Sequence, residues 1–315
     1  MTSSLIALVT RLSDEAEAQW LDLLRAALPG ETVLSLRAMT AEQRDQADIA
    51  VVANPDPNDL KSLPNIAWVH SLWAGVERLV AELPGFDRPI VRLVDPQLAR
   101  NMSEAALAWT FYLFRDMPAY ARQQEQKIWN ALPYRRASDV TVGILGLGEL
   151  GSASADRIRA QDFNVTGWSR SQKDLPGVTC RSGEAGLTQV LEESDIILCL
   201  LPLTAATRGL LNAERLGQMK QGAGLINFAR GPIIDSDALI AALDSGHLGH
   251  AVLDVFDQEP LPESSSLWSH PGITVLPHIS GPTDPRSGAA IVAGNIRAYR
   301  DTGALPDHVD LTVGY

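Results

Sequence analysis

Residues 140–160, VTVGILGLGELGSASADRIRA, decide the fold of this chain. An apolar run rich in β-branched residues ends at Leu145, and a segment of helical composition begins near Ser152. Between them lie glycines in the spacing G-x-G-x-x-G, namely Gly146, Gly148 and Gly151. A strand, a glycine turn and a helix in this order are typical of a dinucleotide-binding βαβ unit.

Each glycine has a physical task in such a unit. The first permits a tight turn, the second lets a pyrophosphate approach the backbone, and the third lets the helix pack against the strand. Because a helix N-terminus favours negative charge, we expect the backbone near Glu149 and Leu150 to face the phosphates. The alternative is an ordinary glycine turn between a strand and a helix.

Further apolar runs on both sides of this turn predict parallel sheets covered by helices. The later runs are VTVGILGLG, FNVTGWS, DIILCLLP, GLINFAR, GHAVLDVF and GITVLPHIS. The earlier ones are LIALVT, TVLSLRA, DIAVVA, AWVHSLWAG and IVRLVD, with a helix at DEAEAQWLDLLRAAL. We therefore expect an α/β protein with two doubly wound parallel-sheet domains, one Rossmann-like and one flavodoxin-like, and the active site in the cleft between them.

The helical stretch NMSEAALAWTFYLFRDM is expected to join the domains, with Asn101 or Ser103 capping its N-terminus. The last helical stretch, residues 287–300, is expected to pack on the first domain. The predicted division is a substrate-binding domain, residues 1–98 plus 285–315, and a dinucleotide-binding domain, residues 99–284.

Composition restricts the class of protein. The 315 residues are 45% hydrophobic and 20% charged, which is typical of a globular chain of about two domains. The formal charge of −12 disfavours nucleic acid and anionic membranes as partners. The apolar run Leu5–Val9 is too short for a signal peptide or a membrane span, so we expect a cytoplasmic protein. Cys180 and Cys199 are expected to be buried, inert thiols, and no residues have the spacing of a metal site.

The segment VTGWSRSQK, residues 165–173, points to the cofactor. An NAD site usually has an acidic residue at the end of this strand, where it binds the ribose hydroxyls and repels a 2′-phosphate. This chain instead has Ser169, Arg170, Ser171 and, close behind, Lys173. Since a guanidinium and an ammonium can both bind a phosphate, we expect NADPH to be preferred, with NADH possible. A solvated basic turn is the alternative.

Charged side chains follow three strands at the edge where a doubly wound sheet binds ligands. LINFARG ends with Arg230, AVLDVFDQEP leads to Glu259, and TVLPHIS contains His278. An arginine can bind a carboxylate and polarise a carbonyl, a histidine can donate a proton, and a glutamate can orient that histidine. Together they predict reduction of a 2-oxo acid by hydride transfer. Singly, each has a structural explanation as a turn residue, a solvated carboxylate or a buried histidine.

The order GLGELG, FARG, DVFDQEPLP and PHIS resembles the D-isomer-specific 2-hydroxyacid dehydrogenases over nearly the whole chain. The stretches WSRSQK, LPGV, ALDSGHLGHAVLDVFDQEPLP, SLWSHPGITVLPHIS and VGY are similar to the glyoxylate/hydroxypyruvate reductase A branch, which prefers NADPH. The resemblance implies reduction of glyoxylate to glycolate and of hydroxypyruvate to D-glycerate, with Arg230, Glu259 and His278 as the catalytic residues.

The resemblance also implies positions for the ligands and a partner. Asp254 matches an aspartate that contacts the nicotinamide carboxamide. SLWAGVE matches a substrate loop in which the backbone N–H groups of Ala74 and Gly75 bind the carboxylate, beside Trp73; Trp73 and Glu77 depart from its usual pattern. The remaining cofactor positions are Leu201, Pro202, Phe228 and Ala229. IWNALPY resembles a dimerisation arm that carries Trp129, so a homodimer is expected.

Two other functions stay open at this point. The same scaffold can serve a larger 2-keto acid, and a dinucleotide-binding fold can act as a sensing module without turnover. The intact set of Arg230, Glu259 and His278 favours an enzyme.

Overall fold

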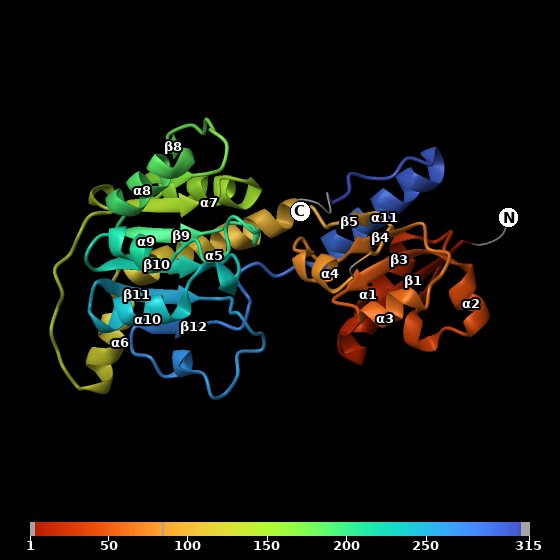
Figure 1. The fold of residues 1–315 in the computed structure, drawn as a ribbon, viewed down its shortest axis with the longest axis horizontal. Helices are drawn as coiled ribbons and strands as arrows, with labels where there is room; N and C mark the ends of the chain where they lie inside the picture. Colours follow the sequence, from red (N-terminus) through yellow and green to blue (C-terminus); the bar gives the residue numbers. More distant parts are fainter. Residues whose placement is uncertain (1–3, 84, 310–315) are drawn as a thin grey trace. The chain divides into compact units, whose positions relative to one another are not determined.

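The structure is a computed structural model that describes residues 4–83 and 85–309. The chain divides into two compact units, Met1–Leu98 with Thr283–Tyr315 and Ala99–Pro282. Each unit is built on one parallel sheet with helices packed on it (Figure 1), which confirms the predicted fold class. The motif VGY at residues 313–315 lies outside the described residues.

The first unit has a five-stranded sheet in the order β2-β1-β3-β4-β5, the flavodoxin-like order. Its strands are β1 (Leu5–Thr10), β2 (Thr32–Ser35), β3 (Ala47–Ala53), β4 (Trp68–Ser71) and β5 (Ile90–Val91). Its helices are α1 (Asp14–Ala27), α2 (Ala41–Gln46), α3 (Pro57–Lys61), α4 (Glu77–Glu82) and α11 (Pro285–Thr302), with a 3-10 helix η1 (Leu36–Ala38).

Alternate residues of β1 enter two separate cores. Ile6 and Leu8 pack with residues of α1 and α11, whereas Leu5, Ala7 and Val9 pack in the core on the other face of the sheet. Side chains alternate along a strand, so a strand covered on both faces reads as a continuous apolar run. This explains why LIALVT shows no polar alternation.

Polar contacts also hold α11 on the first unit. The side chain of Arg300 forms ion pairs with Glu31 (Nε–Oε1 2.9 Å) and with Asp48. His70, fully buried in β4, contacts the carbonyl oxygen of Ser71 through Nδ1 (2.8 Å) and the amide of Asn295 through Nε2 (2.9 Å). The last helix therefore returns to the first unit, as the sequence predicted.

The second unit has a seven-stranded sheet in the order β12-β11-β10-β9-β6-β7-β8. Its strands are β6 (Thr141–Leu145), β7 (Asn164–Trp168), β8 (Thr179–Arg181), β9 (Ile196–Cys199), β10 (Ala223–Asn227), β11 (Leu248–Leu253) and β12 (Ile273–Val275). Its helices are α6 (Met117–Glu125), α7 (Glu149–Arg159), α8 (Gly183–Glu193), α9 (Ala213–Gln218) and α10 (Ser236–Asp244), with 3-10 helices η2 (Ala137–Asp139), η3 (Gly231–Ile233) and η4 (Ser266–Trp268). Helix α5 (Pro96–Phe114) joins the two units in the chain.

The strand order reverses at β6, which pairs with β7 on one side and β9 on the other. A doubly wound sheet binds its ligand at such a switch point, beyond the carboxyl ends of the strands. The sequence predicted six strands here and missed β8. That strand has only three residues, and its register with β7 runs from Thr166↔Thr179 to Trp168↔Arg181 at the edge of the sheet.

The start of α5 differs from the prediction. The helix begins at Pro96, and the carboxylate of Asp95 accepts the N–H of Gln97 (2.8 Å). Asn101 and Ser103 are therefore not caps. The hydroxyl of Ser103 donates to the carbonyl of Arg100 within the helix (2.8 Å), because the first turn, PQLAR, is already helical.

The two cysteines are free thiols with different surroundings. Cys199 in β9 is fully buried, and burial raises the pKa of its thiol to about 12. Cys180 is only partly buried, so the predicted burial is wrong for it; it lies on the short edge strand β8.

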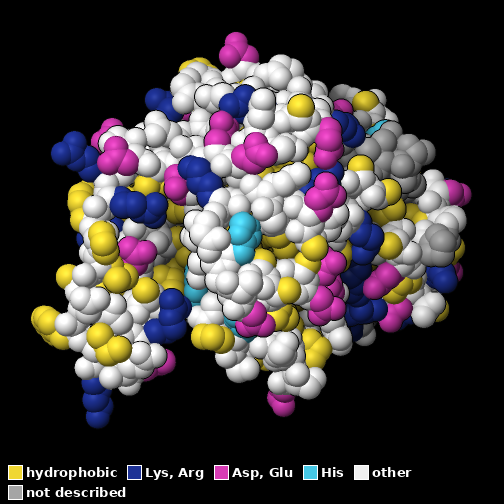
Figure 2. Space-filling view, turned by 60° about the vertical axis from the view of Figure 1, so that its left-hand side comes forward, with side chains coloured by type: hydrophobic (Ala, Val, Ile, Leu, Met, Phe, Trp, Pro, Cys, Tyr) yellow, Lys and Arg dark blue, Asp and Glu magenta, His cyan; other side chains and the backbone are white. Residues whose placement is uncertain are grey.

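Acidic and basic side chains are interspersed over the face shown in Figure 2, as expected for a chain with 38 acidic and 26 basic residues. Within the described part of the chain, no helix is long and apolar enough to cross a membrane. Among residues 4–83 and 85–309, no group of three His, Cys, Asp or Glu residues is arranged to hold a metal ion.

Candidate active site

The glycine turn joins β6 to α7 in the interior of the second sheet. Gly146 has φ +106°, in the region that favours glycine, and its N–H donates to the carbonyl of Trp168 (2.8 Å). A Cβ on Gly151 would lie 1.8 Å from the carbonyl oxygen of Gly146. The close approach of α7 to the turn therefore requires glycine at position 151.

The N-terminus of α7 is open in front of the turn. Gly148 is the N-cap residue, and no described side chain caps the first turn, which contains Glu149 and Leu150. A Cβ on Gly148 would meet no described atom within 4 Å. Uncapped N–H groups at a helix N-terminus favour an anion, so this end of α7 fits a pyrophosphate.

The basic turn follows β7, the neighbour of β6. Ser169 is buried; its N–H donates to the carbonyl of Arg181 (3.2 Å) and its hydroxyl to the carbonyl of Ser171 (2.8 Å). Ser169 thus stabilises the turn itself. Arg170, Ser171 and Lys173 are exposed, and a cation in this place can reach a phosphate attached to a ribose at the sheet edge.

Four further cofactor positions lie at the carboxyl ends of β9 and β10. The side chains of Leu201, Phe228 and Ala229 belong to the two hydrophobic cores of the second unit, and Pro202 is partly exposed. The N–H of Phe228 donates to the carbonyl of Cys199 (3.1 Å). These residues therefore shape the backbone at the edge rather than project functional side chains.

His278 and Glu259 form a hydrogen-bonded pair. Imidazole Nδ1 lies 2.7 Å from Glu259 Oε2, and Glu259 Oε1 accepts the N–H of Phe256 (2.9 Å). The hydrogen bond to Glu259 raises the pKa of His278, although burial lowers it, and the negative charge of Glu259 adds to the rise. Burial alone would raise the pKa of Glu259, but the hydrogen bonds from His278 and Phe256 lower it below its usual value. The pair thus favours an imidazolium beside a carboxylate.

Arg230 follows β10 and shares the electrostatic environment of this pair. The guanidinium of Arg230 donates to the carbonyl of Ala229 (Nη1–O 2.6 Å), and the backbone carbonyl of Arg230 accepts the side-chain amide of Asn227 (3.1 Å). Its positive charge lowers the pKa values of both Glu259 and His278. The structure therefore brings the three residues together, although they are up to 48 positions apart in the numbering of the chain.

Asp254, directly after β11, binds the backbone that follows His278. The Asp254 side chain is buried, and its Oδ1 and Oδ2 accept the N–H groups of Ile279 (2.7 Å) and Ser280 (2.9 Å). This contact was not predictable from the sequence, because it depends on the pairing of β11 with β12.

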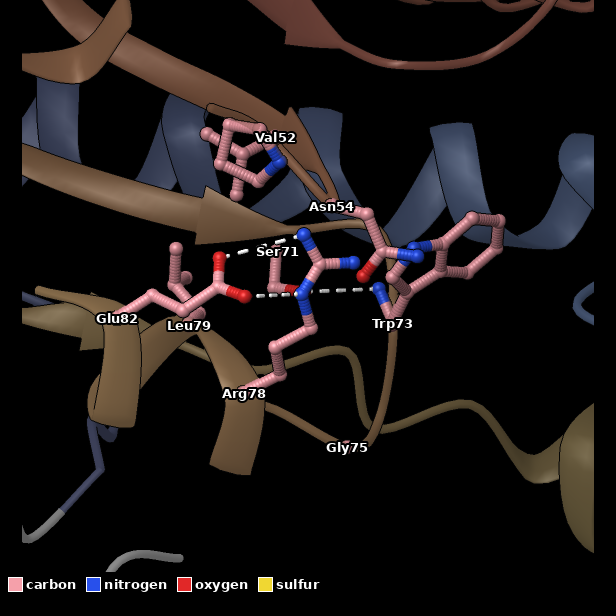
Figure 3. A pocket seen from close by; sticks show the side chains of 9 residues that line it. Val52, Asn54, Ser71, Trp73, Gly75, Arg78, Leu79 and Glu82 are labelled. Carbon is pink, nitrogen blue, oxygen red and sulfur yellow. Dashed lines mark hydrogen bonds and ion pairs between the residues drawn. The ribbon is translucent and has the colours of Figure 1, made fainter. Parts of the chain in front are cut away.

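In the first unit, Trp73, Ala74 and Gly75 follow β4. The N–H of Trp73 donates to the hydroxyl of Ser71 (3.0 Å), and beside this loop lies a cavity of about 20 Å³ (Figure 3). The side chain of Arg78 in α4 lies between this loop and Glu82 (Figure 3), and it forms an ion pair with Glu82 (Nε–Oε1 2.7 Å). Arg78 and Glu82 were not predicted from the sequence, although their i,i+4 spacing was an available signal.

Comparison with known proteins gives consistent results. Residues 107–280 match the model of the D-isomer specific 2-hydroxyacid dehydrogenase family, NAD binding domain. A D-isomer specific 2-hydroxyacid dehydrogenase from Xanthobacter autotrophicus Py2, solved in complex with NADPH and MES, is 38% identical with a TM-score of 0.91, and the match covers 100% of both chains. An NADPH-dependent glyoxylate/hydroxypyruvate reductase from Sinorhizobium meliloti, solved with NADP and sulfate, is 34% identical with a TM-score of 0.91, over 99% of this chain and 100% of that one.

Proposed function

Because the chain belongs to the D-isomer specific 2-hydroxyacid dehydrogenases, which are NAD(P)-dependent oxidoreductases acting on CH–OH groups, we propose that it reduces small 2-oxo acids with NADPH. The proposed reactions are glyoxylate to glycolate and hydroxypyruvate to D-glycerate. The observation that carries the proposal is the His278–Glu259 pair beside Arg230, in the unit that holds the glycine turn.

The choice of NADPH rests on the turn after β7. That turn has no acidic residue at the ribose position, and it exposes Arg170 and Lys173. An acid there would repel a 2′-phosphate, whereas a cation attracts it. Two relatives of at least 34% identity were solved with NADPH or NADP, which supports the same preference here. Ser169, Ser171, Leu201, Pro202, Phe228 and Ala229 would complete the walls of the cofactor site.

When bound, the reduced nicotinamide supplies the hydride that attacks the carbonyl carbon. Arg230 binds the substrate carboxylate and polarises the carbonyl. Imidazole Nε2 of His278 gives its proton to the carbonyl oxygen, which becomes the hydroxyl of the product. Glu259 holds Nδ1 and stabilises the imidazolium before this transfer. A hydride, which the bound nicotinamide would supply, and a proton from His278 are thus added across the C=O bond.

In the first unit, the loop after β4 would also bind the substrate carboxylate. Backbone N–H groups at Ala74 and Gly75 are suited to a carboxylate, and Trp73 would limit the size of the substrate side chain. A bulky indole beside the loop favours glyoxylate and hydroxypyruvate over larger 2-keto acids.

The assembly we propose is a homodimer formed through the arm, defined as residues 128–134. In Figure 1 this segment leaves α6 and runs along the outside of the second unit. It exposes apolar side chains at Ile128, Trp129 and Tyr134, which are 50%, 103% and 73% exposed. Large exposed side chains on an extended segment are expected to be covered by another protein surface, and a second copy of the chain is the simplest one.

The test of the catalytic assignment is His278→Asn. This variant keeps a polar side chain but has no titratable proton donor. We expect turnover of glyoxylate and hydroxypyruvate to fall by about 100-fold or more, while NADPH still binds with an unchanged dissociation constant. Full activity of the variant would refute the role of His278.

A further inference from the structure

We infer that Asp254 is a positioning residue that fixes the backbone around His278. This inference rests on the proposed function for one point, the role of His278 as proton donor. The contact itself is independent of any substrate. Both carboxylate oxygens of Asp254 accept backbone N–H groups of the two residues after His278, Ile279 at 2.7 Å and Ser280 at 2.9 Å.

Asp254 is itself firmly anchored. Its N–H donates to the carbonyl of Asn227 at the end of β10 (3.1 Å), and the residue is only 2% exposed. Two charge-assisted hydrogen bonds that a buried carboxylate accepts are stronger than neutral ones. A rigid connection therefore runs from β10 through Asp254 to the peptide groups of Ile279 and Ser280.

The segment after β12, which carries His278, has a backbone conformation that requires stabilising contacts. Strand β12 ends at Val275, and the N–H of Leu276 still donates to Leu253 in the adjoining strand (2.9 Å). Beyond this point His278 has φ +54°, a left-handed conformation that is unfavourable for a residue with a side chain. Such a conformation persists where the surrounding contacts impose it, and here the two amides after His278 are bound by Asp254.

Asp254 and Glu259 therefore have complementary tasks. Glu259 holds the ring of His278 through Nδ1, and Asp254 holds the backbone that carries the ring. With both points fixed, the direction of Nε2 is defined. A displacement of about 1 Å at a reacting group can cost about 100-fold in rate, so loss of the Asp254 contacts should act mainly on turnover.

The test compares Asp254→Asn with Asp257→Asn. The amide introduced by Asp254→Asn keeps one acceptor oxygen and turns an NH₂ group toward the second backbone N–H, so one contact is lost. Asp257 lies in the same connection after β11 and loses the same charge, but it has no contact with residues 278–280 among the described hydrogen bonds. We expect kcat to fall by about 10- to 100-fold in Asp254→Asn only, with the NADPH dissociation constant within about twofold of wild type.

Two further readouts separate positioning from a purely structural role. The alkaline fall of the kcat profile should move to lower pH in Asp254→Asn. Asp254→Glu keeps the charge but shifts the oxygens by one methylene, so its kcat should fall while its pH profile moves less. The inference is overturned if Asp254→Asn weakens NADPH binding tenfold with kcat unchanged, or if both Asp254 variants lower only the melting temperature.

Failure of the proposed function gives a different pattern. A wild-type protein that reduces no 2-oxo acid contradicts the proposed function alone. The NMR titration of the His278 imidazole needs no substrate and still tests the positioning. Its pKa should be lower than in wild type in Asp254→Glu, which keeps the charge but shifts the backbone, and equal values would contradict the inference.

Discussion

His278 Nδ1 lies 2.7 Å from Glu259 Oε2, and this contact sets the protonation of the imidazole. Glu259 also accepts the N–H of Phe256, so its carboxylate has one oxygen for the backbone and one for the ring. The arrangement favours the positively charged imidazolium, with a proton on Nδ1 that points to Glu259 and a proton on Nε2 that is available for transfer.

This pair predicts the pH dependence of reduction. The pKa of His278 is raised above its usual value of 6.5 by Glu259, so the imidazolium persists at higher pH, and the rate should fall as pH rises through the raised pKa. Glu259→Gln removes the charge, so the fall should move to lower pH and kcat should drop by about 10- to 1000-fold. Steady-state rates across the pH range check this, and an unchanged profile in Glu259→Gln would contradict it.

Two glycine variants should separate binding from folding. Gly148→Ala places a methyl group where no described atom lies within 4 Å, at φ −77°, so the melting temperature should change little. The methyl group would occupy the space proposed for the pyrophosphate, and NADPH affinity should fall by about tenfold or more. Gly151→Ala should instead lower the melting temperature, because its Cβ would lie 1.8 Å from the Gly146 oxygen. Calorimetry and NADPH titration distinguish them; equal effects of both variants would refute this division.

The basic turn gives a cofactor prediction. Arg170→Asp places an acid at the proposed 2′-phosphate site, so the Michaelis constant for NADPH should rise by about tenfold or more while that for NADH changes little. The same measurement on Lys173→Asp shows how much Lys173 contributes to the binding of NADPH. Lys61→Asp makes the same change of charge in the first unit and should leave both constants unchanged. Equal effects of Arg170→Asp on the two cofactors would mean that Arg170 is only a turn residue.

His70 predicts an acid limit to stability. Burial lowers the pKa of this imidazole from 6.5 to about 4, against the hydrogen bond with Ser71. Between pH 6.5 and about 4, His70 is therefore neutral in the folded state and protonated in the unfolded state. The free energy of unfolding is unaffected by His70 above pH 6.5, and it falls as the pH decreases toward 4. The loss attributable to His70 is about 3 kcal/mol. Urea unfolding of wild type and His70→Gln checks this; the variant should show a flatter dependence, and parallel curves would contradict the account.

The arm predicts a partner. Trp129→Ser should weaken self-association, because Trp129 is 103% exposed and would lose a large apolar contact. Light scattering coupled to size exclusion measures the mass. Exposed Trp268 is a matched control outside the arm, and Trp268→Ser should leave the mass unchanged. A monomeric wild type would refute the proposed dimer.

The sequence predicted most of the fold because local patterns determine it. The strand and helix on either side of the glycine turn, the apolar runs of the central strands and the return of the last helix were all confirmed. Strand β8 was missed because three residues at a sheet edge leave no apolar run. The start of α5 was missed because PQLAR is not amphipathic and its cap, Asp95, lies before a proline.

In the candidate site, too, some features were predictable from the sequence and others were not. Arg230, Glu259 and His278 are recognisable because each follows an apolar strand, and their catalytic roles stay predictions. The hold of Asp254 on Ile279 and Ser280 was not predictable, since it joins residues 25 and 26 positions apart through the register of two strands. Arg78 and Glu82 were missed because the short helix α4 has no long periodic pattern.

The most direct test of the central proposal is a panel of 2-oxo acids, glyoxylate, hydroxypyruvate, pyruvate and a larger 2-keto acid, assayed with NADPH and with NADH. We expect glyoxylate and hydroxypyruvate to be reduced with the highest kcat/KM, and NADPH to be more effective than NADH by about tenfold or more. Faster reduction with NADH, or no reduction of either small acid, would contradict the account.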